Sequence, residues 1–553
     1  MSTTEVVFPG PDEIEGFWNL DRMHAPRPIT PLSFDLVIET LAAGFTKAQA
    51  EYDCPIMVTP KEINHYVYVS FHPVDDDAVI ADRASRYQAT LAAKVPKVGK
   101  LWDEEWKPVV IAKNEPAKTA DYASLSDAEM VAKLEEFVEH MTYQWWIHGH
   151  INFVLLSSSA FCDMYDEIVQ PDEKTEAYQT LQGFHTRSVD VSRGMWKLSR
   201  DVKKSPALSK LFDEKSSSEI VGELDKTDDG RAFHAKLREF LEEFGWRSDA
   251  VYDLADIPWR EDESVALSSI AGFVGLDDSE DPELLYQKAV KQREELLAKA
   301  RAKLASDPAK LAKFDELYEA ARYSFPVTED HAFYIDQLGV GVFRRFALAV
   351  GDRLVQKGVV DRPDDVFFLR GAEVPDALRN GGDRRADVAS RRATFEAAGK
   401  VVAPGAVGTP PEIPADAPPD PFMDAIVYRL LGMVPPDDNP DPNIIRAVAG
   451  SPGVLTAKAR VVRSLAEAQD TLEEGEVMVC EMTLPPWVPL FSIAGAVVAD
   501  VGGVLSHCAI VAREFAIPAV VGAVTGTTAI KSGQVITVDG NNGLVYLDGR
   551  SLD

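Results

Sequence analysis

The last hundred residues show the apolar pattern of a small α/β domain. Short runs rich in valine and alanine, separated by turns, predict buried β-strands. These runs are residues 454–462, 477–480, 496–499 and 519–521. Two further runs, 535–540 and 543–547, flank Asn541 and Asn542 and predict a terminal β-hairpin.

From about residue 125 to residue 360, apolar positions recur with the spacing of amphipathic helices. Ser126 followed by Glu129 is a capping-box pattern at the start of a periodic run that reaches residue 153. Segments 283–304 and 308–322 predict further long helices, and a helix over 335–357 should end at Gly358. This part of the chain is therefore predicted to be mostly α-helical.

The N-terminal region, to about residue 120, mixes turns, strands and short helices. Residues 17–32 contain three prolines, which exclude a regular helix over that stretch. Residues 62–71 partly alternate apolar and polar side chains and predict a half-buried strand or hairpin. Residues 364–369 predict one more short strand.

The composition changes sharply between residues 379 and 443, where prolines are frequent. Such a segment is typical of a semi-rigid linker and predicts a boundary between domains. We therefore expect three parts: residues 1–378, a linker over 379–443, and a domain over 444–553. A chain of 553 residues is too long for a single hydrophobic core, which agrees with this division.

The formal net charge of −32 disfavours nucleic acid and anionic membranes as partners. No run of 18 apolar residues predicts a membrane span, and residues 1–5 lack the features of a secretory signal. The four cysteines are scattered without a Cys-x-x-Cys pair. We expect a cytoplasmic protein without disulfides.

The segment 502–518 carries the most specific chemical signal. Gly502 and Gly503 precede Ser506, a good helix N-cap residue, and His507 follows at the predicted start of a helix. The first turn of a helix favours an anion, and a neutral imidazole is a nucleophile near neutral pH. Arg513 follows six residues later. A buried core histidine beside a tight turn is the alternative, and Cys508 is expected to be an apolar packing residue.

This segment, with the strand-like runs on either side and the turn at Thr483 and Pro485, resembles the phosphohistidine domain of the phosphoenolpyruvate-utilising enzymes. That family includes phosphoenolpyruvate synthase, pyruvate phosphate dikinase, rifampin phosphotransferase and phenylphosphate synthase. The resemblance implies that His507 carries a phosphoryl group on Nε2, with Gly503, Ser506, Arg513 and Thr483 supporting it. It also implies a multidomain α+β fold, in which a mostly α-helical substrate-binding domain is joined to a C-terminal swivelling β/β/α phosphohistidine domain.

Several members of that family begin with an ATP-grasp domain, and nothing in this sequence resembles one. The resemblance to phenylphosphate synthase therefore predicts a separate ATP-grasp subunit that binds ATP and Mg²⁺, phosphorylates His507 and releases AMP and phosphate. The sequence itself does not distinguish ATP from phosphoenolpyruvate as the donor.

The predicted acceptor site centres on residues 328–336. A hydroxyl must lose its proton as it attacks phosphorus, and the pKa of histidine suits a general base. We predict His331 as that base, oriented by Glu329, Asp330 or Asp336; a histidine in a helix-start capping cluster is the alternative. The acidic and aromatic surroundings resemble the phenol-phosphorylating branch of the family.

A second candidate group consists of Trp146, His148 and His150. On a helix the two histidines point about 200° apart and cannot share a metal ion, whereas on an irregular segment they could. We predict no metal site and expect that one of them lines an aromatic pocket or that both pack in the core. Arg247 is predicted to bind the transferred phosphoryl group or, alternatively, to cap a helix.

The sequence thus predicts the histidine-bearing subunit of an ATP-dependent phosphotransferase that acts on a small phenolic acceptor, such as a lignin-type aromatic. Two alternatives stay open. The first is phosphorylation of an antibiotic or another alcohol by the same chemistry. The second is a phosphocarrier or regulatory protein without a small-molecule acceptor.

Overall fold

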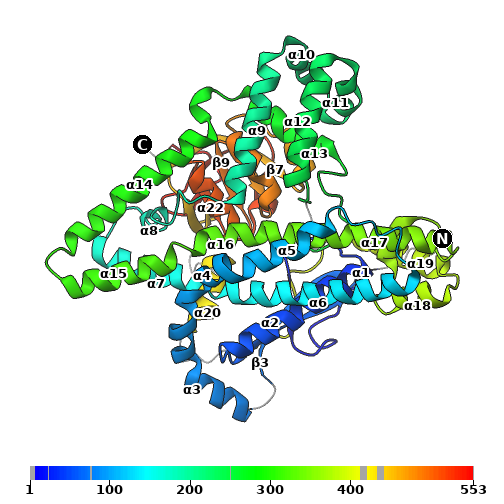
Figure 1. Ribbon diagram of the computed structural model, residues 1–553. Helices are drawn as coiled ribbons and strands as arrows, with labels where there is room; N and C mark the ends of the chain where they lie inside the picture. The colour runs from blue at the N-terminus through cyan, green and yellow to red at the C-terminus, as the bar shows by residue number, and fades with distance from the viewer. Residues whose placement is uncertain are drawn as a thin grey trace. The chain divides into compact units, whose positions relative to one another are not determined.

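The computed structural model describes residues 6–22, 24–74, 77–248, 251–411, 420–432 and 441–551 (Figure 1). The chain forms two compact units, each built from segments that are distant in sequence. Unit 1 contains Met1–Phe153, Ala250–Ile257 and His331–Pro418, and unit 2 contains Val154–Asp249, Pro258–Asp330 and Pro419–Asp553. Within the described residues, no helix is long and apolar enough to cross a membrane.

Unit 1 combines a four-stranded antiparallel sheet, in the order β2-β3-β1-β4, with long helices. Its strands are β1 Phe17–Leu20, β2 Ile56–Ile63, β3 Tyr66–Pro73 and β4 Ala406–Gly408. Its helices are α1 Pro31–Ser33, η1 Phe34–Ile38, α2 Glu39–Glu51, α3 Asp77–Lys94, η2 Val95–Lys97, α4 Val98–Leu101, η3 Trp102–Trp106, α5 Lys107–Ala117, α6 Asp127–Asn152, η6 Ala332–Gln337, α17 Leu338–Gln356, η7 Pro363–Phe368, α18 Glu373–Asn380 and α19 Arg385–Ala398.

Two features of the sequence set the position of α6 in unit 1. The capping box predicted at its start is present, because Ser126 and Glu129 each bind the other's backbone N–H. Gly44 and Gly149 let α2 and α6 approach closely, since a Cβ at Gly44 would lie 2.5 Å from the Trp146 nitrogen and one at Gly149 2.7 Å from the Ala48 Cβ. This crossing fixes the turn of α6 that carries His148.

In unit 2, helices α9, α13 and α14 lie beside the C-terminal sheet, as Figure 1 shows. Its helices are α7 Leu155–Val169, α8 Glu176–Gln179, α9 Arg187–Lys204, α10 Pro206–Glu214, α11 Ser217–Glu223, η4 Leu224–Lys226, α12 Asp228–Phe244, α13 Glu263–Gly275, η5 Asp278–Glu280, α14 Pro282–Lys303, α15 Pro308–Ala321, α16 Ser324–His331, α20 Pro421–Met423 and η8 Asp424–Leu430. Helix α16 belongs to unit 2 except for its last residue, His331, which is the first residue of the third segment of unit 1.

The C-terminal part of unit 2 is a mixed eight-stranded sheet in the order β5-β12-β11-β7-β8-β9-β10-β6, with β7, β8, β9 and β10 parallel. Its core is made almost entirely of valine, alanine and isoleucine side chains. Its elements are β5 Ile444–Arg446, β6 Val448–Ser451, β7 Val454–Val462, α21 Leu465–Thr471, β8 Val477–Cys480, η9 Pro485–Ser492, β9 Ala496–Ala499, α22 His507–Glu514, β10 Ala519–Val521, α23 Gly526–Ala529, β11 Val535–Asp539 and β12 Leu544–Tyr546.

The multidomain α+β fold is confirmed, and so are the strands and the terminal hairpin predicted for this C-terminal part. The strand predicted over residues 364–369 is wrong, because η7 occupies Pro363–Phe368. The cause is local: the buried Asp365 carboxylate accepts hydrogen bonds from the backbone N–H groups of Asp361 and Arg362, which favours a tight helical turn.

The segment predicted as a linker, residues 379–443, contains regular structure that its proline content did not indicate. Helix α19 and strand β4 lie in unit 1, and β4 pairs with β1. Apolar side chains such as Val388, Ala398 and Val407 are buried there, which is why this stretch folds. The proline-rich residues 412–419 and 433–440 lie outside the described residues.

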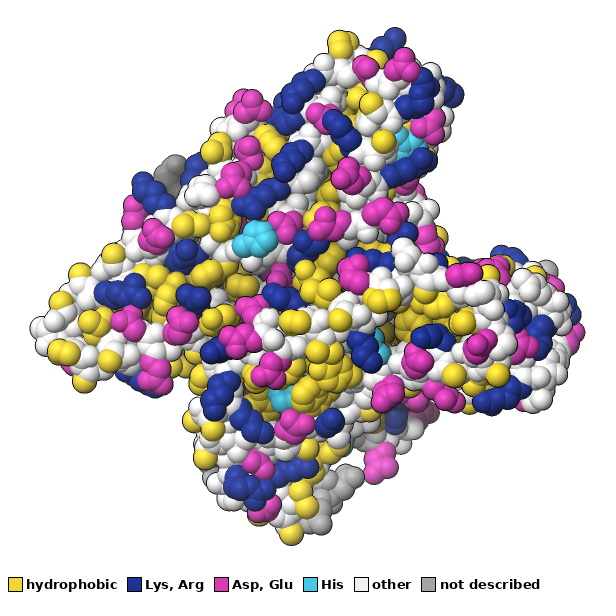
Figure 2. Space-filling view, in the orientation of Figure 1, with side chains coloured by type: hydrophobic (Ala, Val, Ile, Leu, Met, Phe, Trp, Pro, Cys, Tyr) yellow, Lys and Arg dark blue, Asp and Glu magenta, His cyan; other side chains and the backbone are white. Residues whose placement is uncertain are grey.

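Exposed acidic and basic side chains are interspersed on the face seen in Figure 2, consistent with the many ion pairs between residues three or four apart on the helices.

Candidate functional sites

The loop before α22 follows β9 and is shaped by two glycines. Gly502 has a φ of +118°, which only glycine adopts without strain. At Gly503 a Cβ would lie 2.3 Å from the carbonyl oxygen of Arg429 in η8. The backbone of the loop also donates to η8, from Gly503 to Leu430 and from Leu505 to Arg429. The two glycines therefore let the loop pack directly against another backbone.

His507 is the first residue of α22, as the sequence predicts. The Ser506 side chain accepts a hydrogen bond from the Ala509 N–H at 3.4 Å and caps the helix. The helix begins beyond the carboxyl end of the parallel strand β9, where α/β folds bind ligands and helix N-termini favour anions.

Glu329 of α16 holds one nitrogen of the His507 ring. Its Oε1 lies 3.1 Å from His507 Nδ1, and its Oε2 accepts a hydrogen bond from the Ser188 hydroxyl at 2.8 Å. The Glu329 side chain is buried, so this carboxylate is an acceptor fixed in place. It favours the tautomer in which Nδ1 carries the proton and Nε2 keeps its lone pair. Among the described residues, His507 Nε2 is buried and has no hydrogen-bond partner.

Arg513 supports the loop rather than the ring. Its guanidinium donates to the carbonyls of Gly450 at 2.6 Å and Val504 at 2.8 Å, and it lies over the Tyr178 ring. Burial lowers the pKa of Arg513 to about 10. Thr483 is buried beside Cys508, whose thiol pKa burial raises to about 12, so Cys508 is a packing residue and not a thiolate.

The surroundings of His507 carry charges of both signs. Arg247 is buried over Trp259; burial, followed by the charge of Arg187, lowers its pKa to about 9, while Glu329 opposes that shift. Burial, followed by the charge of Glu329, raises the pKa of Glu514 to about 8. Asp330, predicted to orient His331, accepts a hydrogen bond from the Arg187 backbone N–H at the start of α9.

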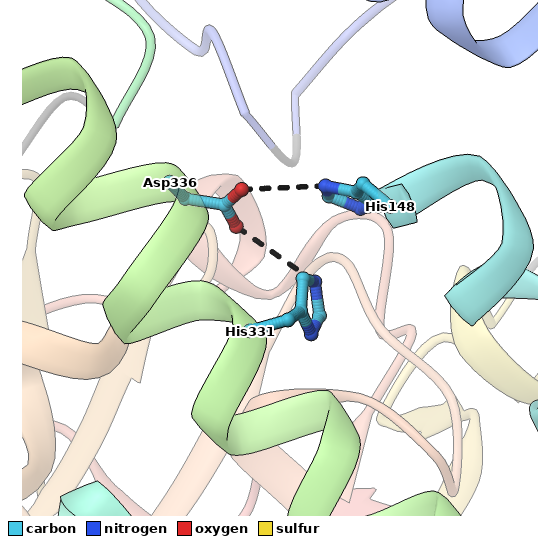
Figure 3. A group of neighbouring side chains, drawn as sticks. All are labelled: His148, His331 and Asp336. Atoms are coloured by element: carbon cyan, nitrogen blue, oxygen red, sulfur yellow. Dashed lines mark ion pairs between the residues drawn. The ribbon is translucent and has the colours of Figure 1, made fainter. Parts of the chain in front are cut away.

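A second cluster lies in unit 1, where Asp336 of η6 is placed between two imidazoles (Figure 3). Asp336 Oδ1 lies 3.2 Å from His148 Nδ1, and Asp336 Oδ2 lies 3.9 Å from His331 Nε2. All three side chains are buried. Burial lowers the pKa of His148 to about 3 and raises that of Asp336 to about 6. The His331 ring contacts the edge of the His148 ring, with centroids 4.4 Å apart.

Aromatic residues surround this second cluster. The Tyr252 ring stacks on His24, which is held by Asp21, and Trp145 lies against both His148 and Tyr252. Although burial opposes the charged form, the carboxylates of Asp21 and Asp336 raise the pKa of His24. Burial raises the pKa of Tyr252, whose hydroxyl has no hydrogen-bond partner among the described residues.

The structure separates His148 from the other two members of the group Trp146, His148 and His150, because the two histidines lie on α6 and make different contacts. His150 Nδ1 lies 3.1 Å from the Tyr52 hydroxyl and its Nε2 3.3 Å from Glu51. The Trp146 indole donates to the same Glu51 carboxylate. His148 instead belongs to the cluster with His331 and Asp336. The helical separation of about 200° explains this division.

The structure thus divides the predicted acceptor residues between two places. His148, His331 and Asp336 come together in unit 1, whereas Glu329, Asp330 and Arg247 belong to unit 2. Sequence reasoning missed Ser188, Glu514, His24 and Tyr252. Only Glu514 had a local signal, since it follows Arg513 in the helix that His507 begins.

Two family models match this chain in the regions that hold these sites. Residues 472–543, which include His507, match the mobile domain of PEP-utilising enzymes. Residues 148–329, from His148 to Glu329, match the fourth domain of rifampicin phosphotransferase.

Similar proteins extend the match to nearly the whole chain. An uncharacterized phosphotransferase, YvkC of Bacillus subtilis, is 28% identical over 98% of this chain and 63% of its own length. Chondramide synthase cmdD of Chondromyces crocatus is 31% identical over 98% of this chain but only 14% of its own length. A rifampicin phosphotransferase of Streptomyces sviceus is 28% identical over 60% of this chain and 36% of its own length. The chain therefore spans less than two thirds of each of these relatives.

Proposed function

We propose that this chain, which carries the mobile domain of PEP-utilising enzymes and the fourth domain of rifampicin phosphotransferases, takes a phosphoryl group onto His507 Nε2 and delivers it to the hydroxyl of a small acceptor. The observation that carries the proposal is the asymmetry of the His507 ring. Glu329 holds Nδ1, while Nε2 keeps its lone pair.

The chemistry follows from that asymmetry. In the first step Nε2 attacks the phosphorus of the donor, the Nε2–P bond forms, and the donor's P–O bond breaks. In the second step the acceptor oxygen attacks phosphorus, and the electrons of the Nε2–P bond return to the ring. Because Glu329 keeps Nδ1 protonated, the ring leaves as neutral imidazole. Buried Nε2 must come away from this docked position to meet a donor, as the term mobile domain implies.

We propose that the acceptor binds at the cluster of His148, His331 and Asp336. The hydroxyl loses its proton there, with His331 required either as the base or as part of a group that lowers the hydroxyl pKa. The aromatic side chains of Trp145 and Tyr252 beside the cluster favour a phenol as acceptor.

The donor remains a separate part of the proposal. We propose ATP with Mg²⁺, bound by a separate ATP-grasp subunit, and release of AMP and phosphate. Mixing this chain with a candidate partner and radiolabelled ATP tests this directly: labelling of His507 only when both proteins are present supports the two-subunit arrangement, whereas labelling of this chain alone contradicts it.

A second acceptor class has its own support. The match of residues 148–329 to a rifampicin phosphotransferase domain supports an antibiotic or another alcohol as the alternative acceptor.

One experiment tests the function and separates the acceptor classes. Phosphorylated protein is mixed with panels of phenols, aliphatic alcohols and rifamycins, and loss of phosphohistidine is measured together with product. Acceleration by phenols supports the main proposal, and acceleration only by rifamycins supports the second. A phosphohistidine that no acceptor discharges contradicts both and favours a phosphocarrier.

A further inference from the structure

We propose that His148, His331 and Asp336 form a binding site for one divalent transition-metal ion, such as Zn²⁺. Each residue offers one ligand atom, and these atoms all lie within 4.8 Å of one another. Two imidazoles and one carboxylate are a common ligand set for such ions, and three protein ligands leave a position open for a further oxygen.

The ligand atoms lie close enough to converge on one ion once the side chains rotate, and the two distances to Asp336 end on different oxygens. Zn–N and Zn–O bonds of about 2.0–2.1 Å place neighbouring ligand atoms of a tetrahedral site roughly 3.3 Å apart. The His148 Nδ1 to Asp336 Oδ1 distance is 3.2 Å, and the His331 Nε2 to Asp336 Oδ2 distance is 3.9 Å. Small side-chain rotations would bring the second distance into range.

Two of the three ligands, His331 and Asp336, are brought together by an irregular helix, and the third, His148, comes from α6. His331 ends α16, and Asp336 lies five residues later within η6, a π-helical segment. In a regular α-helix two residues five apart point about 140° away from each other. A π turn closes its hydrogen bonds between residues five apart, which brings such residues onto a common side; π segments are frequent at functional sites.

Buried polar atoms at this cluster lack partners that an ion would supply. His148 Nδ1 and Asp336 Oδ1 are buried and have no hydrogen-bond partner among the described residues, although they lie 3.2 Å apart. A buried carboxylate oxygen without a donor is costly. The charges that act on Asp336 come from His331 and His24, and neither is a permanent cation. A divalent ion would satisfy both orphaned atoms at once.

The role of the ion rests on the proposed function. An acceptor hydroxyl bound at the open position would have its pKa lowered and would release its proton to water. His331 would then act as a ligand instead of a base. The Tyr252 hydroxyl, buried near Asp336, is available to hydrogen-bond the bound oxygen.

Metal binding is measured directly on the full-length protein, stripped with a chelator and titrated with Zn²⁺ by calorimetry and by competition with a chromophoric chelator. We expect one ion per chain. Asp336→Asn, which keeps the side-chain shape, and His148→Ala should each weaken binding at least about 100-fold. The matched control is His140→Asn, which replaces a half-buried histidine of the same helix that contacts Asn114 instead, and this variant should bind normally. Circular dichroism establishes that each variant is folded.

The outcomes separate this inference from the proposed function. No tight binding by the wild type, or equal binding by Asp336→Asn, would overturn the metal site. If the stripped protein still transfers phosphoryl from His507 to an acceptor at full speed, the ion has no role in the reaction. That outcome would contradict the role of the ion and not the proposed phosphoryl transfer. Tight binding in a protein that discharges to no acceptor would overturn the proposed function alone.

Discussion

The two histidine sites of this protein differ in how the chain builds them. His507 depends on one continuous segment, a glycine turn and a short helix, and its ring contacts Glu329 of the distant helix α16. The cluster of His148, His331 and Asp336 has no such segment: it needs the crossing of α2 and α6 and the π segment η6. The first site leaves a lone pair on Nε2 of a ring held at its other nitrogen, and the second gathers three ligand atoms of buried residues within 4.8 Å of one another. The difference suggests division of labour between carrying phosphorus and preparing an acceptor.

The sharpest test of that division removes the carrier. His507→Ala should abolish both radiolabelling of the chain and product formation, because no other residue is proposed to hold phosphorus. The label in the wild type should be acid-labile and base-stable. Zn²⁺ binding should be unchanged, since the ring is absent from the second cluster, and circular dichroism checks that the variant is folded. A label that persists on serine would contradict the carrier role.

Removing His331 should break only the second half of the reaction. His331→Ala should leave the labelling of His507 intact and slow its discharge to the acceptor by about 10²- to 10⁴-fold, because the hydroxyl loses the group that prepares it. Single-turnover measurements of the two steps check this, with His140→Asn as the control. Equal loss of both steps would show that the two sites are not divided as proposed.

Glu329 is a positioning residue, so its loss should have a smaller effect. Glu329→Gln removes the charge that keeps Nδ1 protonated, and we expect discharge of phosphohistidine to slow by about 10- to 100-fold. Nitrogen chemical shifts of the His507 ring provide a second measurement: the wild type should show a protonated Nδ1 and the variant a mixture of tautomers. Glu319→Gln on α15 is the control. An unchanged tautomer together with unchanged discharge would mean that the 3.1 Å contact has no chemical role.

The same contrast explains what could be predicted from sequence. The strands around His507 and the Ser506 cap were predicted because short apolar runs, glycines and capping residues act within a few positions. The contact between Glu329 and His507 was not predicted, because 178 residues separate the two and no local pattern encodes such a contact. Because Glu329 is only two residues from His331 in sequence, we predicted instead that it orients the His331 ring.

The contacts within the second cluster could not be predicted from the sequence for the same reason. His148 and His150 were considered together because they are two residues apart, and the helix directs them to opposite sides, as expected for a helix, so that each has its own partners. The pairing with Asp336 depends on a π segment, whose extra residue per turn leaves no trace in a hydrophobic pattern. Prolines likewise predicted a continuous linker, but buried apolar side chains in α19 and β4 outweighed them.

The smallest predicted effect concerns Glu514, an acidic residue of α22, the helix that His507 begins. Burial, followed by the charge of Glu329, raises the pKa of Glu514 to about 8 from an ordinary 4.5, while Arg513 opposes the shift. The folded state therefore binds more protons than the unfolded state between pH 4.5 and 8, so the free energy of unfolding falls as pH rises across that window. Glu514→Gln, which cannot ionise, should match the wild type near pH 4.5 and be more stable than it above pH 8.

Thermal unfolding at pH 5 and pH 9 checks this expectation, with the exposed Glu474→Gln as the control for loss of one negative charge. The gain at pH 9 should shrink in the Glu329→Gln background, because part of the penalty on Glu514 comes from that neighbouring charge. A gain of the same size at both pH values would instead assign the effect to packing. In that case Glu329 would be the one carboxylate beside His507 with a functional effect. The His507 site would then resemble the second cluster, where Asp336 is the only acid among the three ligands.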